Sequence, residues 1–335
     1  MKAMVFHEHG GVEKLHYQDF PDPELQPGDC LVRVKAVALN GFEPMILQKT
    51  TALPTPLPMI PGGDIAGEIV ELGSAANDGQ WRVGDRVSIY PMVPDEGMTG
   101  ETRLGGCCEL VRIPAGNLLP VPDDLDFVRA ASLPIAYGTA LRMMVSRGRV
   151  AAGETVLILG ATGGVGTACV QLAKLLGAEV IACGSADWKL EKLRELGADH
   201  VVDTSREDFR KAVWERYGKP HMRHKTGGVD VVINYIGGDT WVDGCRALKP
   251  GGRMLTCGAS AGFQTANDLR YIWTYELNLM GSNGWRPEDQ LEMMAMVADG
   301  RIEPALHAVR PLTETPISIQ ELIERQVFGK TVLLP

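Results

Sequence analysis

A glycine-rich turn near the middle of the chain constrains the fold more than any other feature of the sequence. The segment Gly160-Ala-Thr-Gly-Gly-Val-Gly166 follows an apolar run at residues 156–159 and opens an apolar segment with helical spacing at residues 165–176. Glycine lets the backbone turn sharply and approach a phosphate closely, and the free N–H groups at the start of a helix favour a pyrophosphate. In this strand-turn-helix context the segment predicts a βαβ unit and a dinucleotide-binding site, and the alternative is a packing turn that only needs glycine.

The residues around this turn continue the alternation of strand and helix. Short apolar runs predict strands at residues 156–159, 180–182, 201–202, 229–234 and 252–257. Amphipathic segments between them predict helices at residues 165–176 and 188–196. This rhythm is typical of a doubly wound parallel sheet, the Rossmann type of α/β fold.

The first 120 residues have a different character. Apolar and polar positions alternate in short runs separated by Gly and Pro, which predicts antiparallel strands in a twisted partial barrel. The runs are residues 2–6, 15–19, 31–38, 65–72, 86–90 and 109–113. Four prolines between residues 52 and 63 predict a stiff connector that brings Gly62-Gly63-Asp64 to a defined place, which we expect to be the active cleft.

The last 50 residues begin with an amphipathic helix predicted at residues 287–299. Extended pieces are expected after it, ending in Lys330-Thr-Val-Leu-Leu, and the tail is expected to return to the first domain. The predicted domains are therefore residues 1–125, residues 126–284, and a C-terminal return over residues 285–335.

Charge and composition limit the partners of the chain. With 33 basic and 42 acidic residues among 335, the net charge is −9, which disfavours nucleic acid and anionic membranes as partners. No apolar run approaches the roughly 20 residues that cross a bilayer, and the first residues lack the apolar core of a signal peptide. A cytoplasmic location is expected. The seven cysteines include no C-x-x-C pair, so we expect no disulfide framework and interpret Cys107-Cys108 as a structural pair.

The residues after the second predicted strand bear on the choice between NAD and NADP. A carboxylate at the end of that strand accepts hydrogen bonds from the ribose of NAD, but Gly184 stands there. Ser185 can donate to a 2′-phosphate and Lys189 can reach it as a cation, so NADPH is expected and NADH is less favoured. Ser185 could instead be a turn or capping residue, Lys189 could lie on a solvated helix face, and Asp187 could restore an acidic partner.

Several ordered motifs give the chain a clear family resemblance. It resembles the medium-chain dehydrogenase/reductase superfamily, in its zinc-free branch of quinone oxidoreductases and enoyl reductases, over nearly its whole length. The residues that carry the resemblance are Val37-Ala-Leu-Asn-Gly-Phe-Glu43, Pro61-Gly-Gly-Asp-Ile-Ala-Gly67, Gly84-Asp-Arg-Val87, Ala131-Ser-Leu-Pro134, Gly138-Thr-Ala140, the turn at residues 160–166, Leu248-Lys-Pro-Gly-Gly-Arg253 and Gly329-Lys-Thr-Val332. The resemblance implies a GroES-like twisted β-barrel catalytic domain formed by both termini and a Rossmann domain between them.

The resemblance also implies where the cofactor lies. In the turn it assigns cofactor binding to Gly160, Thr162, Gly163, Gly164, Val165 and Gly166. Along the nicotinamide half it assigns Gly258, Ala259 and Asn283, with Lys330 nearby.

Departures from the family's zinc enzymes are informative. Those enzymes have a cysteine where this chain has Asn40, a His-Glu pair where it has Gly63-Asp64, and a cysteine or acid near Ile135. A catalytic zinc site needs three protein ligands, which these residues cannot supply, so no metal site is expected. The four cysteines of the structural zinc lobe are also missing, since residues 90–110 offer only Cys107 and Cys108.

Without zinc, hydride addition to an activated double bond is easier than oxidation of a simple alcohol, because hydrogen-bond donors can hold the charge that develops on a carbonyl oxygen. The first candidate donor is the Asn40 amide, and Tyr137 and Thr139 are second choices. Asp64 is a further candidate near the catalytic centre, as is Glu43, although either carboxylate could be solvated or capping. Asn40 could instead form an Asx turn, and Tyr137 could be ordinary core.

The expected function is an NADPH-dependent reductase of quinones or of the C=C bond of α,β-unsaturated carbonyl compounds. A zinc-independent alcohol dehydrogenase or carbonyl reductase of the same superfamily is the alternative enzyme, and a non-catalytic, crystallin-like NADPH-binding protein is the alternative of another class. A small-molecule substrate is expected. A homodimer is also expected, paired through the apolar strand at residues 277–282.

Overall fold

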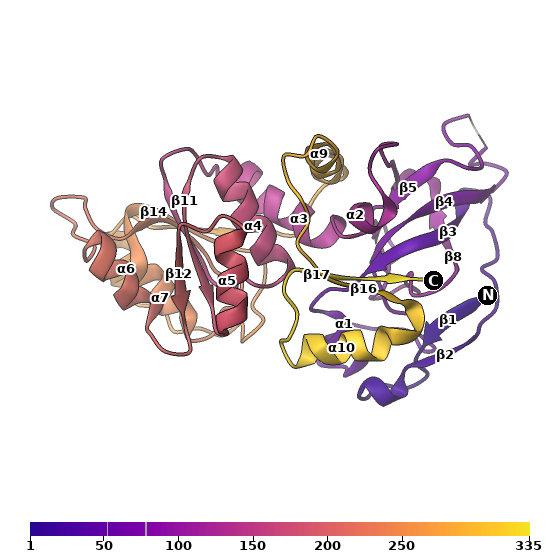
Figure 1. Cartoon of the computed structure of the whole chain (residues 1–335), viewed down its shortest axis with the longest axis horizontal. Coiled ribbons are helices and arrows are strands. Elements are labelled where there is room, and N and C mark those ends of the chain that lie inside the picture. Colours follow the sequence, from indigo (N-terminus) through magenta and orange to yellow (C-terminus); the bar gives the residue numbers. More distant parts are fainter. Residues whose placement is uncertain (52, 78) are drawn as a thin grey trace. The chain divides into compact units, whose positions relative to one another are not determined.

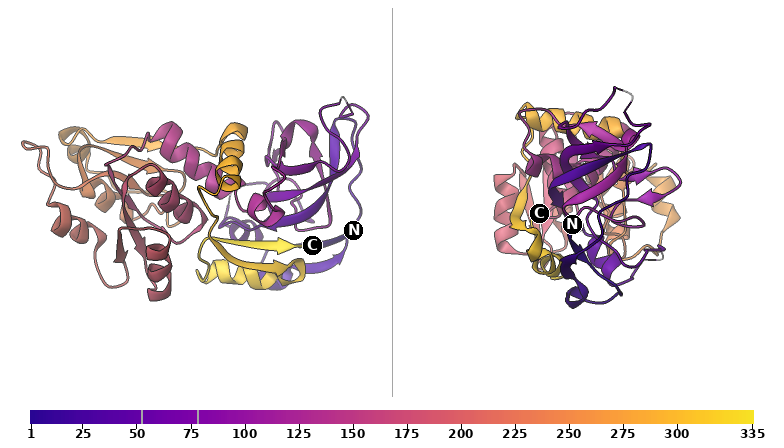
Figure 2. Two further views of the ribbon diagram at one scale, coloured as in Figure 1. Left: turned by 45° about the horizontal axis from the view of Figure 1, so that its top comes forward. Right: turned by 90° about the vertical axis from the view of Figure 1, so that its right-hand side faces the viewer.

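The computed structural model describes residues 1–51, 53–77 and 79–335 and divides the chain into two compact units. Unit 1 comprises Met1–Ala136 and Pro287–Pro335, and unit 2 comprises Tyr137–Arg286. Both chain termini belong to unit 1 (Figures 1 and 2). Residue 52, the first of the predicted connector, lies outside the described residues.

Unit 2 is built around a six-stranded sheet in which all neighbouring strands are parallel. The strand order is β12-β11-β10-β13-β14-β15, which is the 3-2-1-4-5-6 order of doubly wound dinucleotide-binding sheets. The predicted α/β fold class is therefore confirmed. The strands are β10 (Thr155–Ile158), β11 (Glu179–Gly184), β12 (His200–Asp203), β13 (Val229–Ile233), β14 (Leu248–Thr256) and β15 (Asn278–Gly281).

Helices cover both faces of this sheet. Figure 1 shows α4 and α5 on one side of the strands and α6 and α7 on the other. The predicted helices at residues 165–176 and 188–196 appear as α4 and α5, each within one residue of its predicted ends. The helices are α4 (Gly164–Leu175), α5 (Asp187–Glu195), α6 (Phe209–Tyr217), α7 (Thr240–Ala247) and α8 (Leu269–Thr274), preceded by α3 (Pro134–Leu141) and a π-helical segment (Arg142–Arg147).

Unit 1 is built around a seven-stranded sheet. Its order is β16-β17-β3-β4-β5-β9, with β8 also paired to β3, and β1 pairs with β2 separately. The pairs of β3 with β4, β8 and β17 and of β4 with β5 are antiparallel, as predicted for the N-terminal strands. The strands are β1 (Lys2–Val5), β2 (His16–Asp19), β3 (Asp29–Ala38), β4 (Asp64–Leu72), β5 (Arg86–Ile89), β6 (Met92–Val93), β7 (Gly97–Met98), β8 (Leu110–Pro114), β9 (Leu118–Pro120), β16 (Leu306–Pro311) and β17 (Lys330–Leu334).

The helices of unit 1 lie near both ends of the chain. They are α1 (Glu43–Leu47), α2 (Phe127–Ala131), α9 (Pro287–Ala298) and α10 (Thr315–Ile323), with short 3₁₀ segments at Val12–Lys14, Ala115–Asn117 and Leu312–Glu314. β17 pairs with β3, so the tail returns to the N-terminal sheet as expected.

The prediction of extended structure after residue 299 is wrong for α10. In this helix Ile319 is fully buried, and Leu322 and Ile323 pack against the same core. The spacing i, i+3, i+4 is helical, and Pro316 lies in the first turn, where its missing N–H costs nothing. The sequence interpretation missed this helical spacing because the apolar stretch is short and flanked by polar residues.

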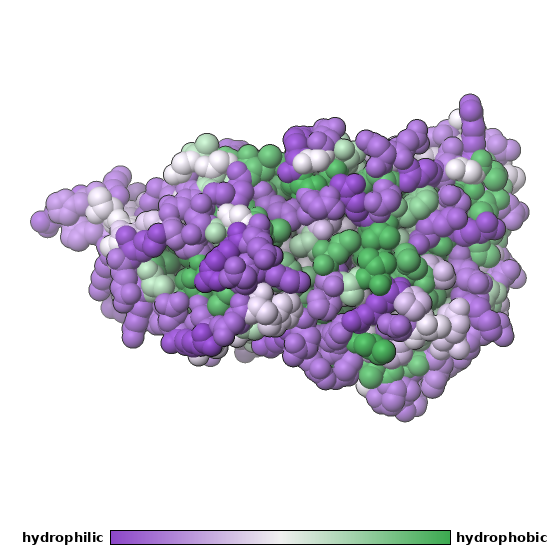
Figure 3. Space-filling model, in the orientation of Figure 1, coloured by the Kyte–Doolittle hydropathy of each residue, from purple (hydrophilic) through white to green (hydrophobic). Residues whose placement is uncertain are grey.

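Each unit has its own apolar core. In unit 1 the core lies between the strands and the helices α1 and α10, with Phe6, Met59, Ile65 and Ile319 fully buried. In unit 2 it includes the inward-facing residues of the parallel sheet, such as Leu157, Val229 and Val232. The face in Figure 3 is largely hydrophilic and is interrupted by separate apolar patches. Among the described residues, no helix is long and apolar enough to cross a membrane.

Candidate functional site

The glycine-rich turn connects β10 to α4 in the geometry that a dinucleotide needs. Gly160 has φ of +73°, a left-handed conformation that favours glycine. A Cβ on Gly166 would lie 2.3 Å from the Gly160 carbonyl oxygen and 2.6 Å from the Ala161 Cα, so a side chain there has no room. The helix cap, Gly163, makes no side-chain capping bond. The turn thus leaves the helix start open, which fits a pyrophosphate.

A tyrosine that the sequence interpretation missed holds this turn in place. Tyr235 follows β13, and its hydroxyl donates to the Gly160 carbonyl at 2.6 Å. Burial raises the pKa of the Tyr235 hydroxyl well above its ordinary value, so the hydroxyl stays protonated as a donor. Its distance of 75 residues from Gly160 in the chain left no local signal; the only available signal was its place just after a predicted strand.

The carboxyl edge of the parallel sheet gathers the other predicted cofactor residues. Gly258 and Ala259 follow β14, and the segment beside them pairs with the one after β13 through Ser260 N to Tyr235 O at 3.1 Å. Asn283 is exposed two residues after β15. Ligands of open α/β sheets bind at this edge.

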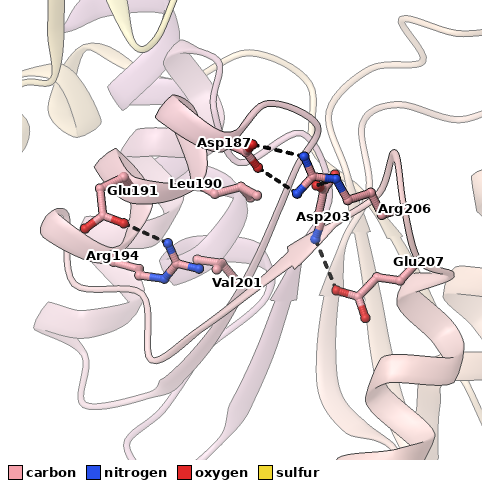
Figure 4. Close-up of a pocket in the computed structure, with 8 residues that line it drawn as sticks. All are labelled: Asp187, Leu190, Glu191, Arg194, Val201, Asp203, Arg206 and Glu207. Atoms are coloured by element: carbon pink, nitrogen blue, oxygen red, sulfur yellow. Dashed lines mark hydrogen bonds and ion pairs between the residues drawn. The ribbon is translucent and has the colours of Figure 1, made fainter.

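A pocket of about 390 Å³ is lined by residues of α5, of β12 and of the loop after β12 (Figure 4). The Arg206 guanidinium pairs there with both carboxylate oxygens of Asp187, at 2.9 and 3.0 Å, and lies 3.3 Å from Asp203. The lining also contains Glu191, Arg194 and Glu207 with Leu190 and Val201. Arg206 is 68% exposed in its side chain, and sequence reasoning missed it because its position in the loop after β12 follows no motif.

The two residues predicted to bind the 2′-phosphate lie in different environments. Ser185 is exposed directly after β11, and the cap of α5 is Ala186, so Ser185 is not a helix cap. Lys189 is buried, with its Nζ 5.2 Å from the centre of the Trp188 ring, and burial lowers its pKa. Lys189 is therefore not on a solvated helix face.

In unit 1 the structure brings together three of the predicted residues. Lys330 Nζ donates to Asn40 Oδ1 at 2.5 Å and to Asp64 Oδ2 at 2.9 Å, and Asn40 Nδ2 donates to Asp64 Oδ2 at 3.0 Å. The second Asp64 oxygen accepts from the Ile135 backbone N–H at 2.9 Å. We call Asn40, Glu43, Asp64 and Lys330 the buried cluster; none of them is more than 8% exposed. Lys330, predicted at the cofactor, is the cation of this cluster.

The chemistry of its neighbours fixes the orientation of the Asn40 amide. An ammonium can only donate and an ionised carboxylate can only accept, so Oδ1 must face Lys330 and Nδ2 must face Asp64. One Nδ2 hydrogen is used by Asp64, and no hydrogen bond of the second is recorded among the described residues. Asn40 therefore acts as more than an Asx turn.

Glu43 completes the cluster from the first residue of α1. The Asn40 backbone N–H donates to Glu43 Oε2 at 2.6 Å, while the buried Oε1 has no hydrogen-bond partner in the described structure. Burial raises the pKa of Glu43 from 4.5 to about 8, against the opposing effect of Lys330. The alternative that Glu43 and Asp64 are solvated carboxylates is wrong, since they are 1% and 0% exposed.

The cluster does not fit a catalytic zinc ion. A Cβ on Gly63 would lie 2.9 Å from the Thr99 carbonyl oxygen and 3.1 Å from Ile135 Cδ1, so a ligating side chain has no space there. Ile135 offers an alkyl group, and Asn40 and Asp64 are already bound to the Lys330 ammonium. Among residues 1–51, 53–77 and 79–335, no three His, Cys, Asp or Glu side chains form a metal-binding group.

Tyr137 and Thr139 lie on α3 in unit 2 and not in the buried cluster. Tyr137 is fully buried, as expected for a core residue, and Thr139 is nearly so. Their assignment to the site stays a prediction. The seven cysteines are free and six are buried, Cys107 and Cys108 among them.

Comparison with known sequence families finds two matching domain families, one in the N-terminal part of the chain and one in the part that contains the parallel sheet. Residues 26–123 match the alcohol dehydrogenase GroES-like domain, and residues 164–299 match the family described as zinc-binding dehydrogenase. The first range covers strands of unit 1, and the second begins at the first residue of α4.

Curated relatives align over nearly the whole chain. Crotonyl-CoA reductase of Streptomyces avermitilis is 30% identical, over 96% of this chain and 82% of its own. The chloroplastic NADPH-dependent alkenal/one oxidoreductase of Arabidopsis thaliana is 31% identical over 100% of this chain and 80% of its own. A quinone oxidoreductase of Pseudomonas aeruginosa is 30% identical over 100% and 99%.

Solved structures share the fold over the full length. The crystal structure of an NAD-dependent alcohol dehydrogenase superposes with a TM-score of 0.90 at 32% identity, covering 100% of both chains.

Proposed function

The chain belongs to the medium-chain dehydrogenase/reductase superfamily, in its quinone oxidoreductase and enoyl reductase branch, and from this premise we propose that it is an NADPH-dependent reductase that works without catalytic zinc. Its proposed substrates are quinones or compounds with a C=C bond conjugated to a carbonyl group. The observation that carries the proposal is the buried cluster, in which Lys330 and Asp64 hold the Asn40 amide where the family's zinc enzymes have a metal ligand.

The proposed domains follow the same logic. Residues 1–125 with 285–335 would form the catalytic domain, and residues 126–284 would bind the cofactor through Gly160, Thr162, Gly163, Gly164, Val165, Gly166, Ser185, Lys189, Gly258, Ala259 and Asn283. Bound NADPH would supply the hydride. The turn fits a dinucleotide because α4 begins after Gly163 without a side-chain cap, so its first backbone N–H groups can meet a pyrophosphate.

The chain's own residues would stabilise the charge that develops during reduction. The free Nδ2 hydrogen of Asn40 would donate to the substrate carbonyl oxygen, and Lys330 at 2.5 Å from Oδ1 polarises the amide toward donation. One well-placed donor of this kind is worth about 3–4 kcal/mol of transition-state stabilisation. Oxidation of a simple alcohol would lack the metal that makes an alkoxide accessible.

Steady-state oxidation of NADPH with a panel of quinones, enals, enones and acyl-CoA esters tests this proposal. We expect turnover of at least one member of the first three classes or of an enoyl-CoA ester. The control is the same mixture of NADPH and each compound without the protein. Oxidation of alcohols is assayed in the reverse direction, by the reduction of NADP⁺. Turnover of alcohols alone would favour the alternative of a zinc-independent alcohol dehydrogenase, which the likeness to an NAD-dependent alcohol dehydrogenase makes worth testing.

The preference for NADPH is supported by the surroundings of β11. No carboxylate stands at Gly184, Ser185 is exposed, and the Arg206 guanidinium lies nearby, where a 2′-phosphate would have to replace Asp187 as its partner. We expect NADPH to exceed NADH by at least about tenfold in kcat/KM, or roughly 1.4 kcal/mol. Lys189→Ala and Arg206→Ala should each weaken NADP⁺ binding by calorimetry and leave NAD⁺ nearly unchanged, with Arg301→Ala, an exposed arginine of unit 1, as control. Preference for NADH would mean that Asp187 binds the ribose hydroxyls.

A cytoplasmic homodimer is part of the proposal. β15 is the edge strand of the parallel sheet, with Leu279 exposed, so a second copy could extend the sheet there. Free cysteines suit a reducing compartment. Light scattering at micromolar concentration should give twice the chain mass, and Leu279→Lys should shift it toward one chain. A monomeric wild-type protein would contradict the dimer.

A further inference from the structure

Glu43 differs from the other carboxylates of unit 1 because one of its oxygens is buried and has nothing to bond to. Oε2 accepts from the Asn40 N–H, but Oε1 has no partner in the described structure. An ionised carboxylate with an unpaired buried oxygen is costly, whereas a protonated one carries no charge. Since Oε2 already accepts a hydrogen bond, the proton belongs on Oε1.

The groups facing Glu43 come from three other segments. They are Lys330 from β17, Asp64 from β4, and the buried thiol of Cys107, whose pKa is raised by burial and by Glu43 itself. Only one of them is a cation, and that cation is already bound by Asp64 and Asn40. The cluster as it stands balances one positive charge with one negative charge, which leaves no charge to neutralise a second carboxylate.

We propose that Glu43 is a positioning residue whose protonated form holds Asn40 in the orientation needed for substrate reduction. Loss of the Oε1 proton places a second negative charge beside Asp64, with Lys330 as the one cation for both. Lys330 Nζ is then drawn from Asn40 Oδ1, and the amide loses the contact that fixes it. The consequence for turnover rests on the proposed reductase function, while the protonation of Glu43 does not.

The pH dependence of turnover is the first test. The alkaline limb should follow Glu43, whose pKa burial raises to about 8. Between pH 7 and pH 9.5 we expect kcat of the wild type to fall by at least about fivefold and that of Glu43→Gln by less than about twofold, each relative to its own maximum. Glutamine keeps the acceptor for Asn40 N–H but cannot ionise. Glu71→Gln, an exposed carboxylate of the same β4 strand, is the matched control and should keep the wild-type profile.

Two measurements without substrate separate this inference from the proposed function. Infrared spectra of the unliganded wild type should show a protonated carboxyl band at pH 7 that disappears by pH 10 and is absent from Glu43→Gln. The side-chain amide signal of Asn40, in protein labelled with ¹⁵N-asparagine, should shift over the same pH range in the wild type only. If no substrate is reduced, these two results still decide the inference.

The inference is overturned if the wild type shows no protonated carboxyl that titrates between pH 7 and pH 10, which needs no variant. It is also overturned if kcat of a folded Glu43→Gln protein falls at alkaline pH as that of the wild type does. An Asn40 side-chain amide signal that does not shift with pH in the wild type overturns it as well.

Discussion

The cofactor turn of unit 2 and the buried cluster of unit 1 are built on different principles. The turn uses backbone groups of seven consecutive residues, and glycine is needed at Gly160 and Gly166 because a Cβ at either position would lie 2.7 Å or less from a neighbouring atom. The cluster uses side chains from four places in the chain, residues 40, 43, 64 and 330, joined by hydrogen bonds across as many as 290 positions. A site of the first kind leaves a motif in the sequence, and one of the second kind leaves single residues whose connection only the fold provides.

The two sites should also fail in different ways. The turn should fail when volume is added, with little dependence on pH. The cluster should fail when charge balance is lost, with strong dependence on pH.

Lys330→Met should have the largest effect, because it leaves the Asp64 carboxylate buried without its cation. Removing one partner of a buried ion pair costs about 3–5 kcal/mol of unfolding free energy. Denaturant unfolding measures the loss. The double variant Lys330→Met/Asp64→Asn should recover at least half of it, and a double variant no more stable than the single one would show that the charges are not coupled.

Gly166→Ala should break the turn. The added Cβ would lie 2.3 Å from the Gly160 carbonyl oxygen. That oxygen belongs to the backbone, so the clash cannot be relieved by turning a side chain. We expect a loss of about 3 kcal/mol, at the upper end for overpacking, that is the same at pH 6 and pH 8.5. Gly116→Ala, where a Cβ meets nothing within 4 Å, is the control. Its unfolding free energy should stay within about 0.5 kcal/mol of that of the wild type. Equal stability of Gly166→Ala and Gly116→Ala would refute the close approach.

Glu43→Gln should change how stability depends on pH. The folded protein holds the Glu43 proton up to about pH 8, whereas the unfolded chain loses it near 4.5. A raised folded pKa means that the stability from this group is complete below pH 4.5 and is lost as pH rises through 8. The difference between variant and wild type should therefore move in favour of the variant by on the order of 3 kcal/mol between pH 5 and pH 8. Parallel stability curves would place Glu43 in its ionised form.

Tyr235→Phe should have the smallest effect. It removes the 2.6 Å hydrogen bond to Gly160 and little volume, so unfolding free energy should fall by about 1 kcal/mol. Nucleotide binding, measured by calorimetry, should weaken several-fold because the turn is less fixed. Tyr271→Phe, on α8 of the same unit, serves as the control. Binding that stays at the wild-type level in both variants would leave Tyr235 a packing residue.

The same contrast explains what the sequence could and could not predict. The parallel sheet, α4 and α5 followed from local period and glycine spacing, and their bounds agree within one residue for the two helices. Asn40 and Asp64 were chosen because the family's zinc ligands are missing at those positions, and Lys330 was placed near the cofactor, but their meeting in one cluster was not predicted. Its contact with Asn40 depends on the pairing of β17 with β3, which places the end of the chain beside residue 38. Helix α10 was missed because its apolar residues show the helical spacing over only a short stretch. Tyr235 was missed because no local motif surrounds it.

The central claim is that an ammonium-held amide replaces the metal of the zinc enzymes. The most direct test is elemental analysis of the purified protein together with reductase activity before and after exhaustive dialysis against a chelator. We predict no stoichiometric zinc and unchanged activity, since Asn40, Gly63 and Ile135 supply no ligand set. About one zinc per chain, removed together with the activity and restored with it on adding zinc back, would contradict the account.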